Sequence, residues 1–218
     1  MKSSSWRSLK KREIEPITPA TRPNPVLGDA LAHAHDWNWN MYREILGFWF
    51  EEIDPSKWWA KDHDFDQLLR GRFSGVHARA ARCELFEWRA EPRGRLAEII
   101  VLDQFSRNMF RGSPLAFAGD ALALALAQEA ISARADEALS ATERSFLYLP
   151  FMHSESLAIH MVAMELYQKN GIRSNLDFEI KHKQIIERFG RYPHRNAILG
   201  RQSTEEEIEF LKQPGSGF

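Results

Sequence analysis

From residue 40 onward, apolar side chains recur at the spacing of one face of an α-helix. In the segment 40–53, Met41, Ile45, Phe48 and Trp49 follow the i, i+4, i+7 and i+8 positions. The same period predicts further helices over residues 62–83, 92–111, 121–133, 142–150, 151–170, 178–189 and 204–212. No segment alternates apolar and polar residues for long, so we expect almost no strand. The pattern therefore predicts an all-α fold of seven to nine helices, stacked as antiparallel pairs.

Residues that favour the start or the end of a helix support these boundaries. Pro92 suits the first turn of a helix, where its missing N–H costs nothing. Gly171 and Gly190 suit the C-terminal cap, which often needs a left-handed residue. Pro150 either breaks its helix or opens the next one. The helix expected over 151–170 starts directly after it.

The first 39 residues have a different composition. They begin with a basic, serine-rich stretch and carry four prolines between residues 16 and 25. Such a segment buries too little apolar surface to offset the entropy of ordering it. We expect a flexible extension over 1–39, with residues 27–35 able to form one short helical stripe, and a single helical domain over 40–218.

The overall charge is close to neutral, with 29 Lys and Arg residues against 30 Asp and Glu residues and a formal net charge of −1. A nucleic-acid partner is not expected, because nucleic-acid-binding domains are usually strongly basic. Cys83 is the one cysteine, which excludes an intramolecular disulfide framework and fits a reducing, cytoplasmic location. No apolar run approaches the roughly 18–20 residues of a membrane span, so no membrane partner is expected. No metal or cofactor is expected either.

Three blocks of polar residues interrupt the apolar helices, the first of them in the helix over 92–111. That helix is apolar around most of its circumference, which predicts burial on several sides. Its polar residues either form a solvated stripe or line a cavity or groove, since a buried helix should not expose donors to apolar neighbours. They are Asp103, Gln104, Arg107, Asn108 and Arg111.

The second block places His153 and Glu155 at the start of the helix expected over residues 151–170. A histidine titrates near neutral pH and a carboxylate can orient it, so the pair can serve as a general acid and base. The alternative is a capping role at the helix start.

The third block alternates basic and apolar residues near the C-terminus. Guanidinium groups around a proline-set turn are good receptors for anions. The alternative is that the arginine stems cover the core while their charged ends reach water. The block contains His182, Arg188, Arg191, His194, Arg195, Asn196 and Arg201.

The three blocks together predict a binding module for an anionic small molecule or peptide group. In this interpretation Arg107, Arg191 and Arg195 donate to the anion, while Asp103 and Glu155 orient them. Two carboxylates face three guanidiniums, which leaves one positive charge for the ligand. We expect these five side chains to converge with His153 at one polar site.

Two other functions fit the same residues. A hydrolase-like enzyme would use His153 or His194 as its base, with Glu155 or Asp103 as the orienting acid. A structural interaction scaffold would contain them as a buried salt-bridge network. Binding predicts arginines that converge on an open pocket, and catalysis predicts a histidine within reach of both a carboxylate and a cavity. A scaffold predicts arginines that are all saturated by protein acceptors.

Several motifs also match a known family. The sequence carries DQFSRN at 103–108, PFMHSES at 150–156 and RFGRYPHRN at 188–196. In this order they resemble a family known as domain of unknown function 924, over about Tyr42 to Leu211. The resemblance implies an all-α fold similar to tetratricopeptide-repeat helical layers. It implies no established activity.

Overall fold

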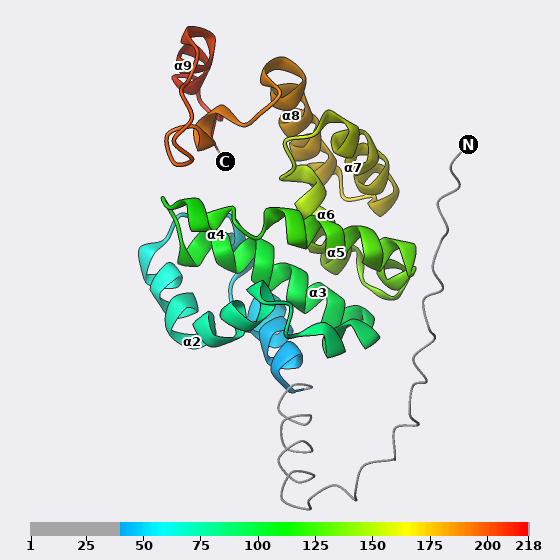
Figure 1. Ribbon diagram of the computed structural model, residues 1–218. Coiled ribbons are helices and arrows are strands. Elements are labelled where there is room, and N and C mark those ends of the chain that lie inside the picture. The colour runs from blue at the N-terminus through cyan, green and yellow to red at the C-terminus, as the bar shows by residue number, and fades with distance from the viewer. Residues whose placement is uncertain (1–39, 218) are drawn as a thin grey trace, which may run out of the picture. The chain divides into compact units, whose positions relative to one another are not determined.

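The computed structural model describes residues 40–217, and these residues form helices and turns without a strand. The predicted all-α class is therefore confirmed for this part of the chain. Figure 1 shows the helices following one another through the domain. The expected extension over 1–39 and the short helical stripe within it lie outside the described residues.

Within the described residues, a helical segment over 40–47 continues into a π-helical turn at Phe48–Glu52, and eight α-helices follow it. Neighbouring helices pack on each other, with α6 on α7, α7 on α8, α3 on α5 and α2 on α4. The helices are α2 (His63–Ala81), α3 (Pro92–Ile100), α4 (Ser106–Met109), α5 (Asp120–Ser132), α6 (Ala141–Met152), α7 (Leu157–Asn170), α8 (Arg173–Phe189) and α9 (Glu205–Leu211).

Local capping chemistry sets most of these boundaries. The Asp62 carboxylate accepts hydrogen bonds from the first backbone N–H groups of α2, and α3 begins at Pro92 as predicted. Gly171 and Gly190 end α7 and α8 with φ angles of +81° and +67°. Glycine adopts this left-handed conformation without a steric penalty.

The helix expected over 92–111 is interrupted by one π-helical turn, Val101–Phe105, between α3 and α4. In a π turn the backbone hydrogen bonds join residues five apart instead of four, which adds one residue to the turn. Such turns are frequent at functional sites. Asp103 and Gln104 lie in it and are buried, as is Asn108 in α4. Asp103, Gln104 and Asn108 therefore do not belong to a solvated stripe, whereas Arg111 is exposed.

The helix expected over 151–170 is wrong at its start. Helix α6 continues through Pro150 to Met152, and α7 begins only at Leu157. Residues 153–156 form a turn, in which the carbonyl groups of His153 and Ser154 accept hydrogen bonds from the side chains of Arg195 and His160. His153 and Glu155 therefore lie in the loop between two helices.

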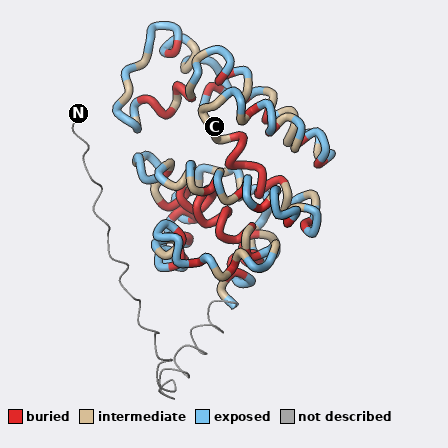
Figure 2. The backbone as a smooth tube through the Cα atoms, turned by 45° about the vertical axis from the view of Figure 1, so that its right-hand side comes forward, coloured by how far each residue is buried: buried red, intermediate tan, exposed pale blue. Residues whose placement is uncertain are grey.

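The core is rich in aromatic side chains. Trp49 and Trp88 are fully buried, and Trp49 packs against Phe105 with ring centroids 5.5 Å apart. Trp58 is half-buried, whereas Trp59 is exposed. Figure 2 shows that the buried stretches run through the centre of the bundle.

One described stretch, Pro114–Ser132, is long and apolar enough to cross a membrane by length and composition, with a mean hydropathy of 1.3. It contains α5. Ala123, Ala127 and Ala130 bury one face of α5 against the core, and Asp120 at its start forms ion pairs with arginines. The expectation that no run reaches this length is corrected for this stretch.

Gly94 marks the closest approach of two backbone segments. A Cβ atom on Gly94 would lie 2.1 Å from the backbone oxygen of Trp88. We expect Gly94→Ala to lower the free energy of unfolding by about 1–3 kcal/mol, because the backbone must shift to relieve the overlap. Urea unfolding measures this. Gly71→Ala in α2 is the matched control, since a Cβ there meets nothing within 4 Å and should stabilise the helix by about 0.5–1 kcal/mol. Similar unfolding midpoints for the two variants would contradict the prediction.

Candidate functional site

Asp103 lies at the centre of a buried polar network, with only 1% of its side chain exposed. Its Oδ1 accepts a hydrogen bond from Nδ1 of His153 at 2.7 Å and lies 3.1 Å from Nη1 of Arg107. Its Oδ2 accepts a hydrogen bond from Nε2 of Gln104 at 2.6 Å. Burial alone would raise the pKa of Asp103, but Arg107, His153 and Gln104 outweigh it and hold that pKa below its usual value. Asp103 is therefore ionised at neutral pH.

The geometry fixes the protonation of His153. An ionised carboxylate can only accept, so Nδ1 of His153 carries a hydrogen and donates it to Asp103. Burial and the nearby Arg107 guanidinium lower the pKa of His153, against the opposing effect of Asp103. The ring is therefore neutral at neutral pH, with its lone pair on Nε2.

The second ring nitrogen of His153 is not fully enclosed by protein. The His153 side chain is 15% exposed, and its Nε2 makes no hydrogen bond to any residue in the described part of the chain. Nε2 is also absent from the fully buried polar atoms that lack a partner. It is the nitrogen through which the ring can reach solvent.

Arg107 and Arg195 meet at Asp120, the first residue of α5. Arg107 makes two hydrogen bonds to the Asp120 carboxylate, at 2.8 and 3.0 Å, and Arg195 makes one at 3.2 Å. The Arg195 guanidinium lies between the rings of Phe117 and Tyr192, 4.7 and 4.6 Å from their centroids. These cation–π contacts and the shared carboxylate hold Arg195 beside Arg107, which in turn contacts Asp103.

Glu155 forms the adjoining part of the network. Its carboxylate accepts two hydrogen bonds from Arg201, at 2.6 and 2.9 Å, and one from the backbone N–H of Tyr192 at 2.8 Å. Burial raises the pKa of Glu155, but these donors outweigh it and keep that pKa below its usual value. Arg201 also donates to the side chain of Asn196.

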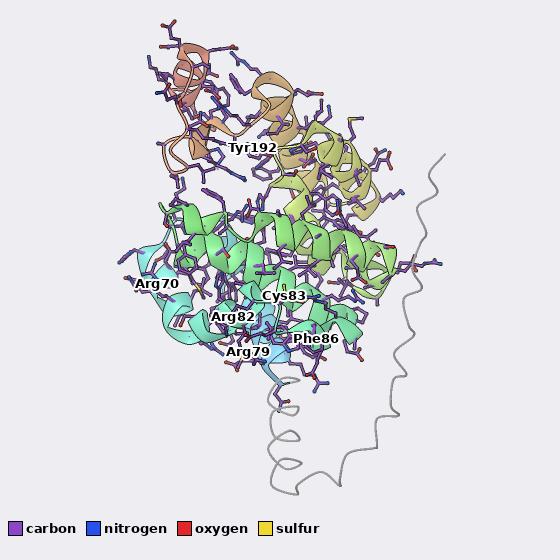
Figure 3. All side chains as sticks on the ribbon, in the orientation of Figure 1. Arg70, Arg79, Arg82, Cys83, Phe86 and Tyr192 are labelled. Atoms are coloured by element: carbon purple, nitrogen blue, oxygen red, sulfur yellow. The ribbon has the colours of Figure 1, made fainter. Side chains whose placement is uncertain are left out.

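Tyr192 connects the remaining histidines to the network. It lies in the segment that follows α8 (Figure 3) and is fully buried. The rings of His182 and His194 pack against it, with centroids 5.8 and 5.5 Å from its own. Both predicted histidines thus lie beside Tyr192, close to the network.

Three predicted ligand-binding arginines form their ion pairs with carboxylates other than Asp103, Asp120 and Glu155. Each forms an ion pair with a carboxylate on another element and lies closer to the surface. The pairs are Arg111 with Asp66, Arg188 with Glu206 and Arg191 with Glu207. The expectation that Arg191 converges with the others is wrong, because Glu207, in the capping box of α9, binds its guanidinium.

The predicted excess of positive charge is also wrong. Asp103, Asp120 and Glu155 balance Arg107, Arg195 and Arg201, while His153 is neutral. Asp120 supplies the third negative charge. The sequence gives no sign of its role, because an acidic residue in the first turn of a helix is favourable there without a partner.

Sequence reasoning also missed Tyr192 and the buried pair of His160 and Glu179. A spacing of seven residues between His153 and His160 was the only available signal, and it indicates a shared helix face rather than these contacts. Within residues 40–217, no group of three His, Cys, Asp or Glu side chains is arranged to hold a metal ion.

Comparisons with known proteins agree with the fold. A family model described as "Bacterial protein of unknown function (DUF924)" matches residues 45–215. A solved structure of a protein of unknown function from Agrobacterium tumefaciens is 42% identical, with a TM-score of 0.77. The match covers 80% of this chain and 98% of that one. No curated protein matches the chain.

Proposed function

The chain belongs to the DUF924 family of bacterial proteins of unknown function, and we propose that it is an enzyme whose acid–base centre is the pair Asp103 and His153. One observation carries this proposal. A buried, ionised carboxylate holds Nδ1 of a neutral imidazole, and the opposite nitrogen, in a side chain that is 15% exposed, has no partner among the described residues. This is the arrangement a general base requires.

The chemistry we propose is hydrolysis. Nε2 of His153 takes a proton from a water molecule as the water oxygen forms a bond to an electron-poor carbon or phosphorus. The imidazolium that results is stabilised by Asp103, which stays ionised. When the bond to the leaving group breaks, Nε2 returns the proton to that group. Arg107 and Arg195 lie beside this centre and favour a substrate whose reacting group gains negative charge.

The network supports a ligand-binding module less well. Arg107, Arg195 and Arg201 each pair with a protein carboxylate, so a free anion would have to compete with Asp120 and Glu155, although Nε of Arg195 is buried without a partner among the described residues. The small molecule or peptide group that we propose as partner is therefore a substrate. A cytoplasmic location belongs to the same proposal, since the exposed thiol of Cys83 fits a reducing compartment.

The charge balance also favours a second candidate, a purely structural network. In that case the buried ions hold the turn over 153–156 to α5 and to the segment after α8, and no reaction takes place. A scaffold accounts for the ion pairs of the three arginines, but it gives no role to the unpaired Nε2 of His153 or to Nε of Arg195, which is buried without a partner among the described residues.

The test is turnover by the full chain of four chromogenic probes: p-nitrophenyl acetate, p-nitrophenyl butyrate, p-nitrophenyl phosphate and bis-p-nitrophenyl phosphate. We expect hydrolysis of at least one probe, and we expect His153→Asn to reduce kcat/KM by about 100-fold or more. The rate should fall on acidification below the lowered pKa of His153, because protonation removes the base.

His63→Asn is the matched control, because His63 is an exposed histidine at the start of α2. It should leave the rate unchanged. Equal rates for wild type and His153→Asn on every probe, the absence of turnover included, would contradict the proposed enzyme and favour the scaffold.

A further inference from the structure

A second histidine–carboxylate pair lies deeper in the domain, where no substrate can reach it. His160 in α7 and Glu179 in α8 are both fully buried, with Nδ1 of His160 2.7 Å from Oε1 of Glu179. Nε2 of His160 lies 2.9 Å from the backbone oxygen of Ser154 and 3.1 Å from the hydroxyl of Tyr192. The pair therefore contacts the same turn that carries His153.

The contacts with this turn are unusually complete. The hydroxyl of Tyr192 donates to the carbonyl of Met152, Nη2 of Arg195 donates to the carbonyl of His153, and His160 donates to the carbonyl of Ser154. Carbonyl groups after a helix end normally bind water or a capping residue. Here three consecutive carbonyls are held by three side chains from other elements.

The hydrogen-bond partners also assign the proton in the buried pair. The carbonyl of Ser154 only accepts, so Nε2 of His160 carries a hydrogen. Oε2 of Glu179 is buried without a partner among the described residues, which is costly for an ionised carboxylate. A protonated Glu179 that donates from Oε1 to Nδ1 of His160 satisfies both observations, and burial raises the pKa of Glu179 in the same direction.

We propose that His160, Glu179 and Tyr192 are positioning residues that orient His153 by holding the carbonyls on either side of it. This inference rests on the proposed function of His153 as a base. Glu179 fixes the tautomer of His160, and His160 and Tyr192 fix the turn. The turn then keeps Nδ1 of His153 on Asp103 and Nε2 turned outward.

The experiment is histidine-selective ¹⁵N NMR of the full chain, which reports the tautomer of His153 at pH 7. In the wild type we expect the Nδ1–H form that donates to Asp103. Tyr192→Phe removes the hydroxyl that holds Met152, and His160→Leu removes the donor to Ser154. Both variants should move His153 toward the Nε2–H tautomer and shift its titration midpoint by at least about 0.5 pH unit, about threefold in the proton-binding constant.

The matched control is Tyr167→Phe. Tyr167 is also a fully buried tyrosine, and its hydroxyl donates to the carbonyl of Ser145, away from the turn. It should leave the His153 tautomer unchanged. Glu179→Gln should also preserve it, because the amide can donate to Nδ1 of His160 as the protonated carboxyl does, whereas Glu179→Leu should not.

The outcomes separate this inference from the proposed function. If Tyr192→Phe and Tyr167→Phe lower the melting temperature alike while the His153 tautomer stays constant in both, the residues are merely structural and the inference falls. The inference falls equally if Glu179→Gln disturbs His153 as much as Glu179→Leu does. If Tyr192→Phe changes the tautomer but His153→Asn leaves every rate unchanged, the positioning role holds and the enzymatic proposal fails.

Discussion

Asp103→Asn is expected to lower the free energy of unfolding by about 3 kcal/mol, because it leaves part of a buried ionic network without its partner. The Asp103 carboxylate accepts hydrogen bonds from His153 and Gln104 and forms an ion pair with Arg107, and its side chain is only 1% exposed. An amide presents one donor in place of an acceptor, so one of these three contacts becomes a donor facing a donor. The loss stays near the lower end for a broken buried pair because Asp120 still holds Arg107.

Urea unfolding at pH 7 measures this change, with Asp66→Asn as the matched control. Asp66 is also a buried aspartate that makes two hydrogen bonds to one arginine, but its partner Arg111 is 37% exposed. Asp66→Asn should cost about 1 kcal/mol or less, since solvent can compensate the guanidinium. A change within about 0.5 kcal/mol of wild type for Asp103→Asn would show that the network contributes nothing to stability.

Acidification from pH 7 to pH 5 is expected to lower the free energy of unfolding by about 4 kcal/mol. Burial lowers the pKa of His182 from 6.5 to about 3 and that of His194 from 6.5 to about 4. Below pH 6.5, these two histidines therefore bind protons in the unfolded chain but not in the folded chain. Stability is fully present above pH 6.5 and falls by about 1.4 kcal/mol per pH unit for each such histidine until its folded pKa is reached.

Urea midpoints at pH 7 and pH 5 test this expectation. The lowered pKa of His153 adds to the effect, while the raised pKa of Glu179 opposes it. His182→Gln removes one of the two main groups and should remove about half of the difference between the two pH values. His63→Asn, which changes an exposed histidine, should leave the difference intact. Equal midpoints at the two pH values in the wild type would contradict this assignment.

Much of the fold could be predicted from the sequence because its signals are local. A helical period, a capping aspartate such as Asp62 and terminal glycines such as Gly171 act within one or two turns of the chain. The same holds for the burial of the helix that carries Asp103, which followed from the apolar residues around its circumference. The start of α7 was misplaced because Arg195, from the segment after α8, and His160, from α7 itself, bind the carbonyls of the turn before α7.

The candidate site, like the fold, could be predicted only in part from the sequence. The sequence by itself identified the blocks that supply Asp103, Arg107, His153 and Arg195, since polar residues in an apolar helix are costly wherever they lie. Only the tertiary structure decided which charges pair, because Asp120 and Arg195 are 75 residues apart and no spacing rule connects them. The tertiary structure also pairs Arg191 with Glu207, so that Arg191 adds no surplus positive charge to the predicted site. Ion pairing depends on distance in space and on burial, and both are set by how the helices pack rather than by the order of residues along them.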